Sequence, residues 1–231
     1  MKRLIIMAAF LSVCMLSIAQ TDGSYSMRVY LSDGSVDTYS VSEVDSVVFV
    51  ELCEINGYEY VNLGLSVLWA TCNIGADSPE DYGNYYAWGE TETKSSYSES
   101  NSVTYYVSMS DISGNATYDA ATANWGDPWR MPTYDEMKEL VDSCTWEYTS
   151  ENAVNGYLIT GPTGNSIFLP AAGYRQGTTL YYAGSYGNYW SSMPSESNTY
   201  HTWYLYFDSV YRYMDLARRY GGRSVRPVSD Y

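Results

Sequence analysis

The chain has 231 residues, of which 45% are hydrophobic and 16% aromatic, and its formal net charge is −15. This length allows one fair-sized domain and a small appendage, with enough apolar residues for a core. A charge this negative argues against nucleic acids and anionic membrane surfaces as partners, although an acidic, solvated surface is the simplest explanation of the charge itself.

Residues 1–19 have the features of a signal peptide. Lys2 and Arg3 form a positive start, and the apolar run at 4–16 is too short to span a bilayer. Ser17 and Ala19 place small residues at the −3 and −1 positions, which predicts cleavage after Ala19 and export. The alternative is a lipoprotein anchored through Cys14, although a lipobox normally has a small residue where Val13 stands. The sequence predicts no transmembrane helix.

Residues 24–50 are predicted to form a small β-hairpin segment. The stretch MRVYLSDGSVDTYSV alternates apolar and polar residues around residues 32–34, Ser-Asp-Gly, which favour a tight turn. Residues 44–50 add a compact apolar segment. Two strands alone are marginally stable, so this piece must dock on the main domain or on a partner. Residues 51–57 are the predicted joint.

The main domain is predicted at residues 58–229. The stretch YEYVNLGLSVLWATCNIG reads as two short strands with Trp69 as a core anchor, and YAWGE as an aromatic strand carrying Trp88. Residues 91–115 are polar without clear periodicity, which predicts a long surface loop. Turn residues recur and helix signals are few, so the predicted fold class is α+β with mostly short antiparallel strands.

The clearest helix signal begins at Thr133. Glu136 stands three residues later, which is the capping-box spacing, and Met137, Leu140 and Val141 recur on one helical face. A hairpin is predicted around residues 161–164, Gly-Pro-Thr-Gly, between the strands LIT and SIFLP. The strands YLYF and YRYM and the closing SVRPV follow.

Three cysteines follow the predicted signal peptide. A bridge between Cys72 and Cys144 would leave Cys53 free, and buried reduced thiols are equally compatible with the sequence. There is no CxxC motif, and His201 is the only histidine, so no metal site and no cofactor are predicted.

No catalytic constellation stands out in the sequence. His201 has no nucleophile motif such as GxSxG beside it. The carboxylate pairs Glu90/Glu92 and Asp135/Glu136 are explained more simply as solvated loop charges and as acids of a first helical turn. The prediction is therefore a protein that is not an enzyme.

Six ordered blocks carry a resemblance: GLSVLWATCNIGA, YAWGE, ANWGDPWRMPTYDEMKEL, NSIFLPAAGYR, YWSS and GGRSVRPV. Between residues 58 and 228 they resemble a bacterial exported paralogous domain named after a major paralogous family of Fibrobacter. That family implies a C-type-lectin-like fold, shared more distantly with formylglycine-generating enzymes and with retroelement-diversified variable proteins. The hairpin segment resembles a piece found behind signal peptides in exported proteins of gut anaerobes.

The resemblance also implies how the domain closes. The first and last strands would pair, VNLGLSV with SVRPV, with the helix at Thr133 beside them, and Trp129, Trp190 and Phe168 would be core residues. The redox cysteines of the formylglycine-generating enzymes have no counterpart, because no cysteine follows Cys144. YWSS and Met-Pro-Ser replace the calcium-binding sequences of sugar-binding lectins, so a standard calcium site is not expected.

Residues 173–228 are rich in Tyr, Trp, Ser, Asn and Gly, the mixture that antibody paratopes use. Residues in this segment fall where the variable relatives carry their ligand surface: Tyr181, Tyr182, Tyr186, Asn188, Tyr200, His201, Trp203, Tyr211, Tyr213, Asp215 and Arg218. The resemblance implies one exposed face that recognises a protein or glycan ligand at a cell surface. The alternatives are a structural or tip subunit of a cell-surface assembly and, third, an enzyme of formylglycine-generating-like fold. An ordinary sheet with tyrosines on its wet face is the plainest interpretation.

Overall fold

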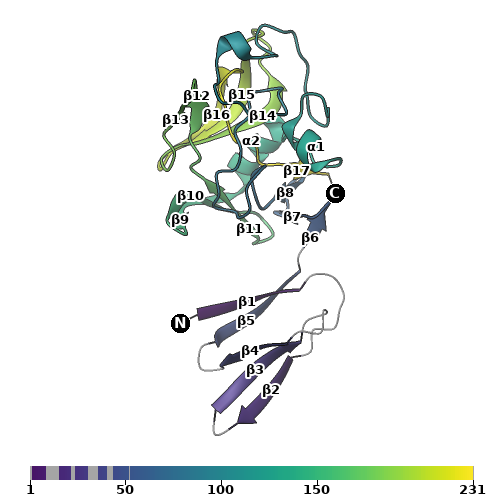
Figure 1. Ribbon diagram of the computed structural model, residues 1–231, viewed down its shortest axis with the longest axis vertical. Helices are drawn as coiled ribbons and strands as arrows, with labels where there is room; N and C mark the ends of the chain where they lie inside the picture. Colours follow the sequence, from purple (N-terminus) through teal and green to yellow (C-terminus); the bar gives the residue numbers. More distant parts are fainter. Residues whose placement is uncertain are drawn as a thin grey trace. The chain divides into compact units, whose positions relative to one another are not determined.

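The computed structural model of the chain describes residues 2–8, 16–21, 24–30, 36–40, 44–51 and 53–230. The chain divides into two compact units, Met1–Glu54 and Ile55–Tyr231 (Figure 1).

The described strands of the first unit form two separate sheets. β2 (Leu16–Thr21), β3 (Ser24–Tyr30) and β4 (Val36–Ser40) pair antiparallel, while β1 (Lys2–Ala8) runs parallel to β5 (Val44–Glu51). The predicted hairpin is confirmed as β3–β4, and its turn at residues 32–34 lies outside the described residues. So does Cys14, which the lipoprotein alternative needs. β1 and most of β2 fall within residues 1–19, whose role as a signal peptide stays a prediction.

The second unit is built from short antiparallel strands and few helices, which confirms the α+β class. Its strands are β6 (Cys53–Ile55, which begins in the first unit), β7 (Tyr58–Val61), β8 (Leu68–Ala70), β9 (Thr145–Glu151), β10 (Val154–Thr160), β11 (Ser166–Pro170), β12 (Tyr174–Gln176), β13 (Thr179–Tyr181), β14 (Gly187–Pro194), β15 (His201–Phe207), β16 (Arg212–Arg218) and β17 (Val228–Ser229). Its helices are α1 (Ala120–Trp125), α2 (Tyr134–Ser143) and the single 3₁₀ turn η2 (Glu99–Asn101). The strands form four sheets, ordered β17-β8-β7-β6, β11-β10-β9, β12-β13 and β14-β15-β16.

The two ends of the second unit pair, in a register that differs from the predicted one. Val228 of β17 stands opposite Trp69 of β8, whereas the sequence predicts residues 224–228 against residues 61–67. Residues 62–67 form no strand, because Leu63, Leu65 and Val67 turn into the core and Gly64 takes a positive φ of 79°. Residues 224–227 instead bond to other segments, with Val225 accepting from the backbone amide of Ile74 at 3.1 Å.

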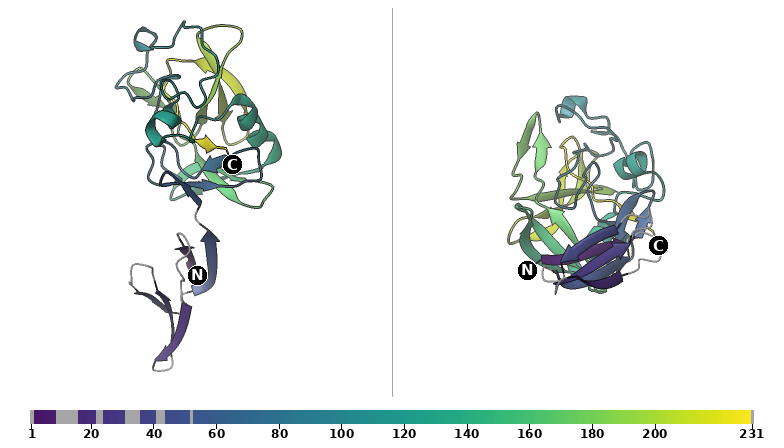
Figure 2. Two further views of the ribbon diagram at one scale, coloured as in Figure 1. Left: turned by 90° about the vertical axis from the view of Figure 1, so that its right-hand side faces the viewer. Right: turned by 60° about the horizontal axis from the view of Figure 1, so that its bottom comes forward.

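The predicted helix and its cap are confirmed as α2. The Thr133 hydroxyl accepts from the Glu136 amide at 3.3 Å, and the Glu136 carboxylate accepts from the Thr133 amide at 2.8 Å. Met137 and Leu140 are buried, so one helical face packs into the core. Figure 2 shows α2 beside the β14-β15-β16 sheet, with which it makes contacts along all three strands.

The predicted core residues Trp69, Trp129, Trp190 and Phe168 are all buried, as expected. Trp69 belongs to an apolar cluster between α2 and the sheets of β10 and β15, and Trp129 and Trp190 belong to a second cluster around α1 and Trp88. Large aromatic side chains therefore fill the interior, while other tyrosines are left at the surface.

The long loop at residues 91–115 is irregular, as predicted, but it is not merely a surface loop. Tyr97, Thr104 and Ile112 are buried anchors, and the Tyr97 hydroxyl donates to the Tyr85 carbonyl at 2.5 Å. Because these anchors hold the loop against the sheets, it can shape a site.

Two smaller predictions for this region are wrong. YAWGE is no strand and contributes a single bridge from Tyr86 to Arg223. Glu90 is a buried carboxylate rather than a solvated loop charge, because it pairs with Lys94 and accepts from the Val103 amide at 2.9 Å.

Cys53, Cys72 and Cys144 are free thiols, which settles the alternative that the sequence leaves open between a bridge and reduced cysteines. Within the part of the chain that the structure describes, no helix is both long and apolar enough to cross a membrane.

Candidate functional site: a tyrosine-lined groove

The hairpin β12–β13 and the loop around Tyr97 line an open groove of about 690 Å³. Its lining, called here the tyrosine groove, consists of Tyr97, Ser98, Glu99, Tyr174, Gln176, Gly177, Thr178, Thr179, Tyr181, Tyr182 and Tyr220. The Tyr97 and Gly177 backbones exchange hydrogen bonds of 2.8 and 2.7 Å, so the loop and the hairpin form one wall. Gly177 has a positive φ of 58°, which the tight β12–β13 turn requires of its central residue.

A continuous series of aromatic contacts leads out of this groove. This tyrosine ladder consists of Tyr174, Tyr181, Tyr182, Tyr186, Tyr206 and Tyr213. Ring centroids are 5.6 Å apart for Tyr174–Tyr181, 4.5 Å for Tyr182–Tyr186 and 5.1 Å for Tyr206–Tyr213. Such spacings are those of favourable aromatic pairs. The ladder therefore fixes the orientation of several exposed rings.

A second group of tyrosines adjoins the groove through Tyr220. Tyr105 contacts Tyr220 at 5.3 Å and Tyr106 at 4.4 Å, and Tyr106 contacts Tyr200 at 5.9 Å. The Tyr106 hydroxyl donates to Glu99 at 3.0 Å, which raises the pKa of Tyr106 to about 12. The long loop and the β14–β15 connection thus meet beside the groove.

Two of the exposed tyrosines hold a backbone conformation that bulky residues rarely adopt. Tyr106, 61% exposed, has a φ of 68°, and Tyr182, 53% exposed, has a φ of 56°. Left-handed backbone in a residue with a large side chain costs roughly 1–3 kcal/mol. Glycine would remove that cost at either position.

A smaller pocket of about 260 Å³ opens beside the groove and shares Tyr174, Gln176 and Tyr220 with it. This arginine pocket is also lined by Arg175, Arg218 and Arg223. His201 lines it too, and burial, followed by the charges of Arg218 and Arg219, lowers the pKa of His201. His201 is therefore neutral near pH 7.

Trp203 belongs to a different hollow. It lies edge-on against Tyr134 of α2 at 4.7 Å and lines a space of about 620 Å³ together with Asp111, Asp135 and Glu196. This hollow has a carboxylate-rich wall, shares no lining residue with the tyrosine groove and shares Leu216 with the arginine pocket. It is a separate surface.

The structure brings together most, but not all, of the predicted site residues. Tyr181 and Tyr182 line the tyrosine groove, and His201 and Arg218 line the arginine pocket. Tyr186 and Tyr213 belong to the tyrosine ladder, and Tyr200 contacts Tyr106 beside the groove. Asp215 is exposed and stands opposite Tyr204, a residue of the arginine pocket, in the β15–β16 pairing.

Three of the predicted residues do not fit a single exposed face. Asn188 is only 3% exposed, because β14 is buried on both faces from Gly187 onward. Trp203 lies in the other hollow. Tyr211 is exposed, but it lies in the turn between β15 and β16, whereas His201 is at the other end of β15.

Several residues of the groove, of the arginine pocket and of the tyrosine group beside them do not appear among the sequence predictions. They are Tyr97, Glu99, Tyr105, Tyr106, Tyr174, Gln176, Tyr220 and Arg223. The tyrosine-rich stretches around residues 105 and 174 and the two glycines before Arg223 are signals that could indicate them. Their convergence depends on tertiary contacts.

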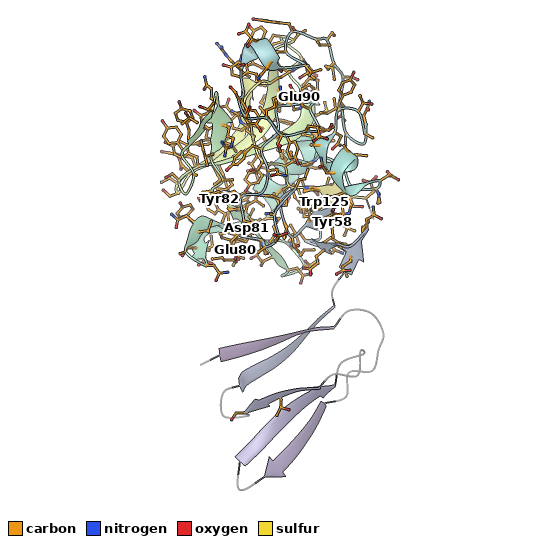
Figure 3. The ribbon with its side chains drawn as sticks, viewed as in Figure 1. Tyr58, Glu80, Asp81, Tyr82, Glu90 and Trp125 are labelled. Carbon is orange, nitrogen blue, oxygen red and sulfur yellow. The ribbon has the colours of Figure 1, made fainter. Side chains whose placement is uncertain are left out.

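Carboxylates and thiols elsewhere in the second unit do not form an evident catalytic site. Glu90 lies at the opposite end of the unit from Glu80 and Asp81 (Figure 3). Burial raises the pKa of the Cys72 thiol and raises that of Cys144 to about 11, which disfavours the nucleophilic thiolate. No group of three His, Cys, Asp or Glu side chains suited to a metal ion occurs among the described residues. Figure 3 also shows Tyr58 against Trp125, a stacked pair at 3.9 Å that belongs to the core.

Comparison with known proteins gives one match. Residues 138–228 match a family model described as "Domain of unknown function (DUF8237)". This segment runs from α2 to the start of β17 and includes the hairpin β12–β13 and all three arginines of the pocket. No curated protein and no solved structure matches the chain.

Proposed function

We propose that this protein is an exported, non-enzymatic binding module whose tyrosine groove recognises a glycan. The observation that carries the proposal is the left-handed backbone of Tyr182, which lines the groove, and of Tyr106, which adjoins the groove through Glu99. Both side chains are more than half exposed, so burial of their rings does little to offset the backbone strain. Strained residues of this kind cluster at functional sites, and exposed rings held in this way are available to contact a bound ligand.

A glycan suits the groove better than a protein surface does. The groove is concave, and its exposed rings offer faces that can pack on the apolar side of a sugar ring. Glu99, Gln176 and Thr179 add a few polar groups for the hydroxyls of a sugar. A concave aromatic lining with a few polar groups is typical of small-ligand sites.

The fold assignment and export belong to the same proposal. The pairing of β17 with β8, the position of α2 and the long anchored loop support a C-type-lectin-like fold of the Fibrobacter paralogous type. Export rests on the signal-peptide features of residues 1–19.

The non-enzymatic part of the proposal rests on the groove and on the adjoining arginine pocket, which His201 lines. His201 Nδ1 lies 3.3 Å from the Asn198 amide nitrogen, so the ring is held by a side chain that is neither nucleophile nor acid. The only acidic residue of the groove lining is Glu99, and one of its two carboxylate oxygens accepts a hydrogen bond from the Tyr106 hydroxyl. Binding is the function that these groups support.

The test is a glycan array probed with the purified protein and with matched variants. Tyr181→Ala and Tyr182→Gly should each weaken the retained glycan roughly 30-fold or more, as expected for a central aromatic contact. Trp203→Ala, in the separate hollow, is the control and should leave binding intact. If the protein binds no glycan on the array, or if only Trp203→Ala loses binding, the proposal is contradicted.

A further inference from the structure

Two buried arginines near the C-terminus are fully used by the fold. Arg226 donates to four acceptors: the Asn73 side chain and the backbone carbonyls of Ala70, Thr71 and Phe168. Arg219 donates to three backbone carbonyls, those of Thr104, Val107 and His201. These guanidinium groups are paired as buried polar groups in proteins normally are, and their role is structural.

Arg223 is buried in a different way. It is 8% exposed, and its Nε has no hydrogen-bond partner. Its guanidinium lies 4.3 Å from the Trp190 ring centroid, 4.5 Å from that of Tyr204 and 5.4 Å from that of Tyr174. Among the residues that the structure describes, no carboxylate forms an ion pair with it.

The charge on Arg223 nevertheless persists at neutral pH. Burial lowers the pKa of its guanidinium to about 10, whereas Tyr204, which hydrogen-bonds to it, the Tyr174 hydroxyl and the Asp215 carboxylate act in the opposite direction. Cation–π contacts and one neutral hydroxyl compensate only part of the desolvation of a buried cation. Folding alone therefore leaves the charge of Arg223 without a paired anion.

The pocket around Arg223 is electrostatically unusual for this chain. It is lined by three arginines and by no aspartate or glutamate, although acidic residues outnumber basic ones by 27 to 12 in the sequence. Its volume of about 260 Å³ lies just below the range of roughly 300–1,000 Å³ for complete ligand pockets. It can therefore take one small charged group while the rest of a ligand lies in the adjoining groove.

We propose that the arginine pocket is an anion subsite, and that the ligand is an acidic glycan whose carboxylate or sulfate group pairs with Arg223. This inference rests on the proposed glycan binding by the tyrosine groove. The planar guanidinium of Arg223 lines the pocket and matches either oxyanion through paired hydrogen bonds. Arg175 and Arg218 attract the same charge, and Tyr174, Gln176 and Tyr220 connect the two hollows.

The first experiment compares three oligosaccharide probes by isothermal titration calorimetry. Tetragalacturonate should bind at least about tenfold more tightly than its methyl ester, which keeps the sugar rings but lacks the charge. A sulfated tetrasaccharide is the third probe, and its affinity shows whether a sulfate group can take the place of the carboxylate. Equal affinities for acid and ester would overturn the anion subsite while leaving glycan binding by the groove in place.

A second measurement does not depend on the groove. The Arg223 Nε–Hε resonance is followed by NMR during titration with sodium glucuronate, with glucose, and with sodium chloride at matched ionic strength. The resonance should shift with glucuronate only. If it does not move, the subsite is refuted even where neutral glycans bind; if it moves while no oligosaccharide is retained, the proposed function fails and the subsite stands.

Variants separate binding from folding. Arg223→Met should abolish the preference for acid over ester while the melting temperature stays within about 3 °C of the parent, whereas Arg226→Met should melt far lower. Arg223→Lys keeps the charge but loses the planar fork, so it should bind tetragalacturonate more weakly than the parent. A loss of melting temperature in Arg223→Met as large as in Arg226→Met would make Arg223 structural and overturn the proposal. Because Arg218 is exposed, Arg218→Gln should fold normally and weaken binding of the acid severalfold, which tests the pocket even if Arg223 variants fail to fold.

Discussion

Replacing Tyr182 with glycine tests the strain argument, because the same substitution should affect folding and binding differently. A non-glycine residue in the left-handed region costs roughly 1–2 kcal/mol, and Tyr182 has a φ of 56°. Glycine removes this cost but adds about 0.4–1 kcal/mol of unfolded-state entropy. Both Tyr182→Gly and Tyr182→Ala lose the ring contact with Tyr186, so the comparison between them isolates the backbone.

The expected result is that Tyr182→Gly is more stable than Tyr182→Ala by about 0.5–1 kcal/mol. This corresponds to a melting temperature higher by roughly 1–4 °C for a unit of this size. All seven tryptophans lie in the second unit, so urea unfolding followed by tryptophan fluorescence reports on that unit alone. Both variants should lose glycan binding. If the glycine variant is the less stable of the two, the left-handed conformation is not a source of strain and the argument for function fails.

Three further predictions concern the frame that holds the site. Arg226→Met should destabilise the second unit by about 3–5 kcal/mol in urea unfolding, because buried acceptors lose their donor. The control is Arg212→Met at an exposed position, which should change stability by less than about 0.5 kcal/mol. Similar urea midpoints for the two variants would refute a structural role for Arg226. Thr133→Ala should cost ~1 kcal/mol by removing the helix cap, with no change in glycan affinity, and an unchanged urea midpoint would mean that the cap is not formed. Deleting residues 224–231 should abolish the cooperative thermal transition, since β17 and Arg226 are lost together; a sharp transition near the parent temperature would argue against this closure.

Local signals in the sequence are enough to predict several elements of the fold. The cap and apolar spacing that begin at Thr133 predict α2, and the turn residues at 161–164 predict the β10–β11 hairpin, because both depend on neighbours in sequence. The register of β17 against β8 is not predictable in this way. It depends on how Leu63 and Leu65 enter the core, which only tertiary packing decides.

The candidate site is predictable only in part for the same reason. Tyr181 and Tyr182 stand out by composition, but their neighbours Tyr97 and Glu99 come from a loop about 80 residues earlier that has no periodic pattern. The separation of Trp203 from His201 is not predictable from strand alternation, because the two residues are two apart in β15 and alternation places them on one face.

The central claim is that the tyrosine groove, rather than the Trp203 hollow, holds the ligand. The most direct measurement is a backbone amide chemical-shift map of the protein titrated with tetragalacturonate. The account predicts shifts at residues 97–99, 174–182 and 220–223 and little change at residues 193–197 and 134. Shifts confined to the latter segments, or no saturable shifts, would contradict it.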